Sequence, residues 1–349
     1  MMRQLPRSAV LPAMVLFLLA VWSTSRSEAG DIVDMTGRKV TVPDRIQKVY
    51  CASPPATYLL YALDRSLLAG LNYPVAARDG KYVPKDLAAL PILGGWFGQG
   101  KTPNLESIMA VKPDIMIVWE RKDSALNDKI EETAQRLGLP IVYMRLNELG
   151  QYPEAILFMG NLLDRSERSR TLSEYAARKL VEVEGLVAGI PEQSKVSVYY
   201  AEDPDGLSTE CDRSWHVELI NLAGGRNIYQ CTPRDGYGME RITLEQVRLK
   251  DPEVMIVQEQ PFLERLYGDP RWQDIAAVKN RRVHLVPRSP FNWFDRPPSF
   301  MRLIGLQWVV KVLYPDLFQA DLVEETRHFH KLFLDLDLEV NEARDLLGL

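Results

Sequence analysis

Histidine and cysteine are scarce in this sequence, which has four histidines and three cysteines among 349 residues. They form no compact set with the spacing of a zinc site. Capture of a bare metal ion is therefore less favoured than capture of a complex in which other groups hold the metal. The sequence also offers no evident acid–base pair for catalysis, which argues against an enzyme.

An excess of basic residues is also absent. The sequence has 42 lysines and arginines against 47 aspartates and glutamates, for a net charge of −5. A mildly acidic chain lacks the electrostatic footprint of a nucleic-acid-binding protein, so no nucleic-acid partner is expected. The apolar content of 46% is enough for large hydrophobic cores, and the length fits two domains of ordinary size.

Beyond the N-terminus, no apolar run is long enough to span a bilayer. Arg3 and Arg7 precede an apolar run at 9–22, and small residues follow where a cut after Ala29 requires them. A spanning helix needs about 20 apolar residues, so this shorter pattern predicts a signal peptide over 1–29 rather than a membrane anchor. Because no cysteine follows the run, we expect a periplasmic protein without a lipid anchor.

The cysteines are informative if the compartment is oxidising. Cys211 and Cys231 flank one helix-like segment, and we expect a disulfide between them, worth about 3 kcal/mol for a loop of about 20 residues. Cys51 is then left over at the end of an apolar strand. It is interpreted as a buried small hydrophobe, with a role as a metal ligand as the alternative.

Predicted strands alternate with predicted helices along most of the chain. Short apolar strands are typical of a parallel sheet covered on both faces, and the first half has three, at 48–51, 115–118 and 141–144. Segment 105–118 combines a short helix, a proline stop and a strand, and it recurs as 244–257 at a constant offset of 139 residues. We therefore expect an α/β fold with two similar lobes.

A helical segment separates the two halves. Segment 153–190 has apolar residues at spacings of three and four, which predicts a long amphipathic helix with a break near 164–166. A helix of about 20 residues runs about 30 Å, enough to brace one lobe against the other. The predicted organisation is a signal peptide (1–29), an N-terminal α/β lobe (30–152), the linking helix (153–190) and a C-terminal α/β lobe with a helical tail (191–349).

One glycine-rich stretch matches the sequence pattern of a nucleotide-binding loop. The stretch 95–102, GWFGQGKT, matches the loop that cradles phosphates in nucleotide hydrolases. In that motif a long helix starts at the lysine, whereas here Pro103 follows at once and Pro113 keeps the next helix short. The match is interpreted as chance, and 94–101 as a loop at a ligand cleft.

Several motifs follow one another in a fixed order along nearly the whole mature chain. They include DMTGR (34–38), the strand and loop at 49–55, PNLE (103–106), KPDIMIV (112–118), LAGGRN (222–227), and the segments at 244–253 and 293–299. In their order and spacing, the chain resembles the periplasmic binding proteins of the ferric-siderophore and cobalamin family, which serve ABC importers. The resemblance implies two α/β lobes with mainly parallel sheets, joined by one long helix, with the ligand in the cleft between them.

The resemblance also implies partners. A protein of this class binds a small-molecule ligand, needs no intrinsic cofactor besides the transported metal chelate, works as a monomer and delivers its cargo to a membrane permease and its ATPase. Glu106 and Glu245 occupy equivalent first turns of the repeated helix, where members of the family dock onto permease arginines. The helix dipole alone also favours a glutamate there, although it explains a matched pair less well.

Candidate ligand contacts follow from the rule that ligands of open parallel sheets bind beyond the carboxyl ends of the strands. The residues there mix aromatic rings with cations, which suits a bulky anionic ligand with flat or apolar parts, such as a metal chelate. Core packing is the alternative for any single tryptophan, and an ion pair for any single arginine. The candidates at strand ends and in the adjoining loops are Ser53, Tyr58, Trp96, Phe97, Lys101, Trp119, Arg121, Arg145, Arg288, Trp293 and Arg296.

Two further candidates come from outside this rule. His216 precedes a predicted helix, roughly where members of the family contact ligand, and Tyr237 is a candidate phenolate partner for iron. A helix-starting histidine without a ligand role is the alternative for His216. His328 and His330 lie on a late, charged helix and are expected to face solvent.

These observations predict a periplasmic solute-binding protein that delivers a metal chelate, with a ferric siderophore as the leading candidate. Cobalamin, haem, a nickel chelate and an oxyanion such as molybdate remain open as alternative cargoes. A chelatase-like enzyme and a ligand-sensing subunit are the rivals from other classes.

Overall fold

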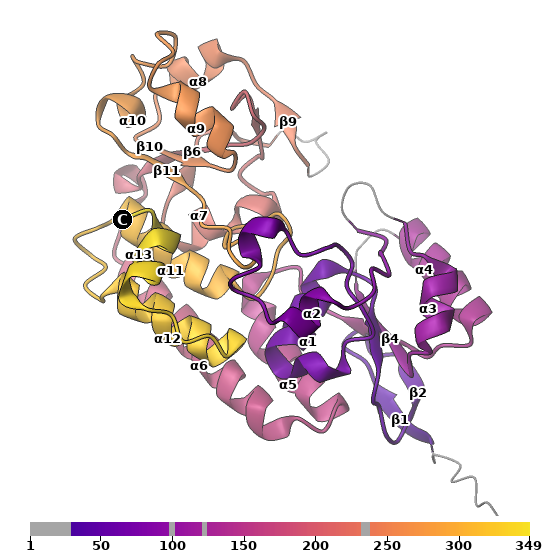
Figure 1. The fold of residues 1–349 in the computed structure, drawn as a ribbon. Helices are drawn as coiled ribbons and strands as arrows, with labels where there is room; N and C mark the ends of the chain where they lie inside the picture. The colour runs from indigo at the N-terminus through magenta and orange to yellow at the C-terminus, as the bar shows by residue number, and fades with distance from the viewer. Residues whose placement is uncertain (1–28, 98–101, 121–123, 232–237) are drawn as a thin grey trace, which may run out of the picture.

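A computed structural model describes residues 29–97, 102–120, 124–231 and 238–349 (Figure 1). Most of the predicted signal peptide lies outside these residues, as do the candidate ligand contacts Lys101, Arg121 and Tyr237. The chain forms two α/β lobes with a mainly helical base that connects them. No helix within the described residues has the length and apolar character needed to cross a membrane.

The first lobe is built on a parallel sheet in the order β3-β4-β5. All five residues of β4 are buried, as expected for a central strand covered on both faces. An antiparallel hairpin of β1 (Ala29–Val33) and β2 (Lys39–Pro43) adjoins this sheet. The strands and helices of the lobe are β3 (Val49–Cys51), α1 (Pro54–Asp64), α2 (Lys85–Ala88), α3 (Leu105–Val111), β4 (Ile115–Trp119), α4 (Ser124–Leu137) and β5 (Ile141–Met144).

The second lobe has a parallel sheet in the order β11-β10-β6-β8 and a short antiparallel pair, β7 with β9. The central strands β6 and β10 are buried throughout. The strands are β6 (Ser197–Ala201), β7 (Ser208–Thr209), β8 (Arg226–Asn227), β9 (Glu240–Arg241), β10 (Val254–Val257) and β11 (Val283–Leu285). The helices are α7 (Glu218–Leu222), α8 (Leu244–Lys250), α9 (Gln260–Leu266) and α10 (Ala276–Lys279).

The sequence repeat is also a repeat in structure. α3 leads into β4 just as α8 leads into β10, and a side chain caps each helix at its start: Asn104 accepts from a backbone N–H of α3, and Thr243 does so for α8. Each helix ends at a residue in the left-handed region, Lys112 (φ 49°) or Asp251 (φ 40°). In each lobe, the same short helix therefore lies in the same position, directly before a buried strand of the sheet.

The predicted linking segment forms a helical hairpin. α5 (Tyr152–Leu162) ends just before Asp164, whose φ of 55° breaks the helix, and α6 (Ser166–Val187) then continues. The Ser173 hydroxyl donates to the carbonyl of Pro153, 2.8 Å away and 20 residues earlier, so the two helices pack side by side. α6, with 22 residues, is the long helix that joins the lobes.

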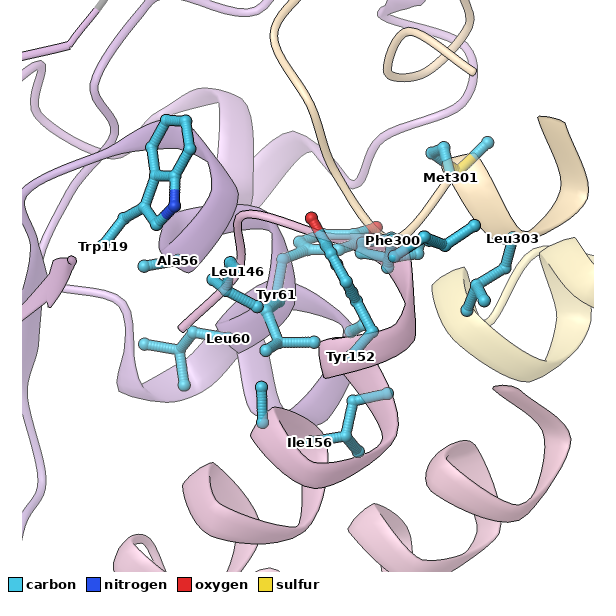
Figure 2. Packing of buried hydrophobic residues seen from close by; sticks show 14 of the residues in the cluster. Ala56, Leu60, Tyr61, Trp119, Leu146, Tyr152, Ile156, Phe300, Met301 and Leu303 are labelled. Carbon is cyan, nitrogen blue, oxygen red and sulfur yellow. The ribbon is translucent and has the colours of Figure 1, made fainter. Parts of the chain in front are cut away.

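Three helices at the C-terminus complete the base. α11 (Arg302–Leu313) packs on α6 and α7, α12 (Leu322–Leu334) packs on α11 and on α1 of the first lobe, and α13 (Val340–Leu347) packs on α12. Figure 2 shows side chains of α1 and α5 together with Phe300, Met301 and Leu303, all of which belong to one hydrophobic cluster. A continuous core at the base resists a wide swing of one lobe against the other.

The expectation for one of the late histidines was wrong. His328 is exposed as expected, but His330 is completely buried, and its Nδ1 lies 2.7 Å from the carbonyl of Thr326. Burial lowers the pKa of His330 to about 4. The charged residues of α12 lie on its outer side, whereas His330 lies on the side that packs against the core near Trp293.

Candidate ligand-binding cleft

A cavity of about 620 Å³ lies between the lobes. Trp96, Phe97 and Trp119 line it from the first lobe, and Trp215, His216 and Arg296 line it from the second. Trp119 is the last residue of β4, so the sheet delivers its ring to the cleft. Trp215 opens a short turn that precedes α7 and that is capped by the Ser214 hydroxyl.

Aromatic rings form a continuous path across the cleft. The Phe97 and Trp119 ring centroids are 5.3 Å apart, and Trp119 meets Trp215 edge to face at 5.4 Å. The Trp215 ring in turn lies 3.5 Å from that of His216. The Trp119 Nε1 donates to Asn147 at 3.1 Å, which fixes the orientation of the indole. Such rings can hold the flat faces of an organic ligand from both lobes.

Charged side chains form the second-lobe wall of the cleft. Arg296 pairs with Glu202 through Nε and with Glu210 through Nη2. Both carboxylates are at most 1% exposed, and burial raises the pKa of Glu202 to about 7 and also raises the pKa of Glu210. The Arg296 Nη1 makes no hydrogen bond within the described residues, so it is a donor that a ligand can use.

His216 is oriented by a buried carboxylate. Its Nδ1 bonds to Asp295, which is 1% exposed, while its Nε2 lies 4.0 Å from Glu210. A carboxylate that holds one ring nitrogen fixes the direction of the other, as it does for histidines that ligate metals. Arg296 can therefore donate to the oxygens of an anion. His216 presents its Nε2 in a fixed direction, as a ligand for the metal of a complex or, when the ring is protonated, as a second donor.

The structure brings five of the predicted ligand contacts together at the cleft: Trp96, Phe97, Trp119, His216 and Arg296. Other candidates lie nearby. Tyr58 stacks on Phe291 at 4.0 Å in an adjoining chamber of about 210 Å³, which Arg288 also lines. Arg145 lines a separate polar hollow on the far side of Trp215.

The structure does not bring two of the predicted contacts, Trp293 and Ser53, to the cleft. Trp293 is completely buried and donates its Nε1 to the Ser289 carbonyl at 3.2 Å. It packs at the base, where α11 passes so closely that a side chain at Gly305 would collide with the Trp293 carbonyl. Ser53 is also completely buried at the start of α1, and its hydroxyl has no hydrogen-bond partner among the residues that the structure describes. Neither side chain lines the cleft.

The candidate arginines within the described residues form ion pairs, which was the alternative left open for each of them. Arg145 lies 3.8 Å from Glu120, Arg288 lies 3.5 Å from Glu259, and Arg296 pairs with the two glutamates described above. The arginines that follow the strands have carboxylate partners from neighbouring strand ends. Recognition of an anion here must rely on positioned donors rather than on net positive charge.

Three residues that line the cleft, Trp215, Glu202 and Asp295, were not among the predicted contacts, and neither was Glu210, the buried partner of Arg296. Glu202 directly follows β6, so the strand-end rule points to it. Trp215 and Glu210 lie in an irregular loop where no periodicity indicates which side chains face the cleft. Asp295 precedes the predicted contact Arg296, but only the structure shows that its carboxylate bonds to His216.

The loop that carries Glu210 and Trp215 is restrained by a disulfide between Cys211 and Cys231. The link holds the start of the loop near the end of β8, and the Arg213 side chain also reaches the Cys231 carbonyl. Cys51 is a free, buried thiol at the end of β3. Glu106 and Glu245 do not line the cleft and are exposed in the first turns of α3 and α8.

The chain belongs to the periplasmic binding protein family, whose sequence pattern matches residues 49–290. It is similar to the structure of an ABC transporter solute binding protein from Sulfurospirillum deleyianum, with 36% identity and a TM-score of 0.86 over 91% of this chain and 99% of that one. The fold and the family define a substrate-binding protein of an ABC importer that works outside the cytoplasm with a permease and an ATPase, and not an enzyme.

Curated relatives bind different cargoes. The molybdate-binding protein MolA of Haemophilus influenzae is 23% identical over 86% of this chain and 90% of its own length, and its molybdate-bound structure aligns with a TM-score of 0.72. A vitamin B12-binding protein of Vibrio campbellii is 26% identical over 72% of this chain and 84% of its own length. These relatives share the class of protein but not one ligand.

Proposed function

We propose that this protein carries a metal chelate, with a ferric siderophore as the first candidate, to the permease of an ABC importer. The observation that carries the proposal is the pairing of aromatic rings from both lobes with the oriented donors of His216 and Arg296. Chelates of this kind have flat or apolar organic parts around anionic oxygens. The aromatic rings can pack against the organic parts, and His216 and Arg296 can contact the anionic oxygens.

An oxyanion such as molybdate is the second candidate, and the similarity to MolA favours it. A small oxyanion needs several donors at short range, and it uses aromatic rings little. His216 and Arg296 supply such donors, but the four rings and the cavity of about 620 Å³ leave most of the space to something larger. The size of the cleft therefore ranks the chelate first. Cobalamin, haem and a nickel chelate are members of the same broad class.

The proposal includes the predicted export and docking. The protein is exported through the signal peptide 1–29, binds its cargo in the periplasm as a monomer, and approaches the permease with Glu106 and Glu245. The two exposed carboxylates lie on equivalent helices, one in each lobe, and within the described residues no ion pair neutralises them. A partner with a cation opposite each of them would contact both lobes at once.

Tryptophan fluorescence titration against ferric siderophores, cobalamin, haem, a nickel chelate and molybdate tests the cargo. We expect one ferric chelate to bind with a Kd well below 1 mM, and His216→Ala or Arg296→Ala to weaken that binding at least about tenfold. Tight binding of molybdate alone would select the second candidate. A Kd above about 1 mM for every compound, which is weaker than about −4 kcal/mol, would refute the transport role.

A further inference from the structure

Two exposed apolar side chains stand on the two copies of the repeated helix. Leu249 of α8 is 84% exposed, and Met109 of α3 is 63% exposed. Single exposed apolar side chains are common on proteins, but these two share a setting. Each follows the glutamate in the first turn of its helix, Met109 by three residues after Glu106 and Leu249 by four after Glu245. Residues at these spacings are neighbours on one helix face, so each lobe presents a carboxylate beside an apolar side chain.

Both helices are firmly fixed to their lobes. Each has seven residues and a single fully buried side chain, Ile108 in α3 and Val247 in α8, and each is capped at its start and closed by a left-handed residue. Figure 1 shows α3 and α8 at the outer parts of the two lobes. A rigid surface loses little conformational entropy on binding, which favours its use in recognition.

We propose that Met109 and Leu249 are apolar anchors of the surface that docks on the permease, each entering an apolar depression next to a cationic residue. This inference rests on the proposed function. A partner that contacts the same pair of features once on each lobe needs two like sites, as a permease built from two like subunits would offer. The glutamates orient the approach, and the desolvated apolar side chains contribute the affinity.

The test uses the full mature protein and the permease–ATPase complex of its importer in nanodiscs, with association measured by biolayer interferometry. Glutamine replaces Met109 and Leu249 because it removes apolar character and keeps good helix propensity. The double variant Met109→Gln/Leu249→Gln is expected to associate at least about tenfold more weakly than the wild type. Val181→Gln, at a 67% exposed position on α6, is the matched control and is expected to associate normally.

The other outcomes separate this inference from the proposed function. Cargo affinity by tryptophan fluorescence stays at the wild-type value in every variant if Met109 and Leu249 act only in docking. Normal association of the double variant, together with lost association of Glu106→Lys/Glu245→Lys, would overturn the anchors and leave glutamate docking intact. Failure of the wild type to associate would overturn both. Sedimentation could instead show that the wild type dimerises and that the double variant does not. A second copy of this protein, rather than the permease, would then cover Met109 and Leu249, and the inference would be overturned.

Discussion

Trp119 of the first lobe and Trp215 of the second meet edge to face across the cleft, with ring centroids 5.4 Å apart. One ring is fixed by the end of a buried strand, and the other belongs to a loop that a disulfide restrains. A ligand that enters between them must contact both lobes. If cargo binds here as proposed, the pair links occupation of the cleft to the relative position of the lobes.

Replacement of these rings is expected to weaken cargo binding. Trp119→Leu and Trp215→Leu should each lower the affinity for the ligand identified by titration at least about tenfold, because a buried aromatic contact is lost. Trp215→Phe keeps an aromatic face and should recover most of the affinity. Calorimetric titration measures both. Equal affinities for the leucine and phenylalanine variants of Trp215 would mean that stacking plays no part.

The stability of the second lobe should depend on pH through Glu202. Burial raises the pKa of Glu202 to about 7 from an ordinary 4.5, so between these values the folded state binds more protons than the unfolded state. The free energy of unfolding therefore falls as pH rises from about 4.5 to about 7. Glu202→Gln mimics the protonated form and should lose this part of the pH dependence. Urea unfolding of both proteins across this range measures the difference, and parallel curves would contradict the shift.

Reduction of the Cys211–Cys231 disulfide should destabilise the protein. Opening a loop of about 20 residues costs about 3 kcal/mol in the chain-entropy estimate. Urea unfolding with and without a reductant measures the loss, and Cys211→Ser/Cys231→Ser should reproduce it and no longer respond to reductant. Cys51→Ala is the control, because Cys51 is free and buried, and its response to reductant should equal that of the wild type. An unchanged midpoint in the wild type would contradict a stabilising role for the bond.

Charge reversal in the repeated helix should uncouple transport from binding. Glu106→Lys/Glu245→Lys places cations where the permease is expected to offer cations, so uptake driven by the importer should fall by at least about tenfold while cargo affinity is unchanged. Each single variant should have a smaller effect. Uptake assays in cells that depend on this protein measure the loss. Normal uptake with the double variant would show that these carboxylates do not dock.

The sequence predicted the sheets better than the helix starts. β4 and β10 were found because four or more consecutive buried apolar residues leave a clear pattern. α1 begins at Pro54, inside the segment 49–55 that was interpreted as a strand and a loop, because prolines suit the first helical positions as well as loops. The break between α5 and α6 falls at Asp164, inside the segment where local polarity indicated it.

The cleft was only partly predictable because loops supply half of it. Trp119 follows from the strand-end rule, whereas Trp215 and Glu210 depend on how an irregular loop folds back over β8. Trp293 resembles Arg296 in its sequence setting, yet it faces the base while Arg296 faces the cleft. Carboxylate partners for the arginines come from distant segments, and no local pattern reveals pairs of that kind.

Equilibrium dialysis of the tightest-binding compound tests the central claim, which is that cargo binds between the two aromatic walls and leaves unchanged. The account predicts one equivalent of compound on the wild type, recovered intact after denaturation, and little on the Trp119→Leu/Trp215→Leu variant at the same concentration. Full occupancy of that double variant, or recovery of a chemically altered compound, would contradict it.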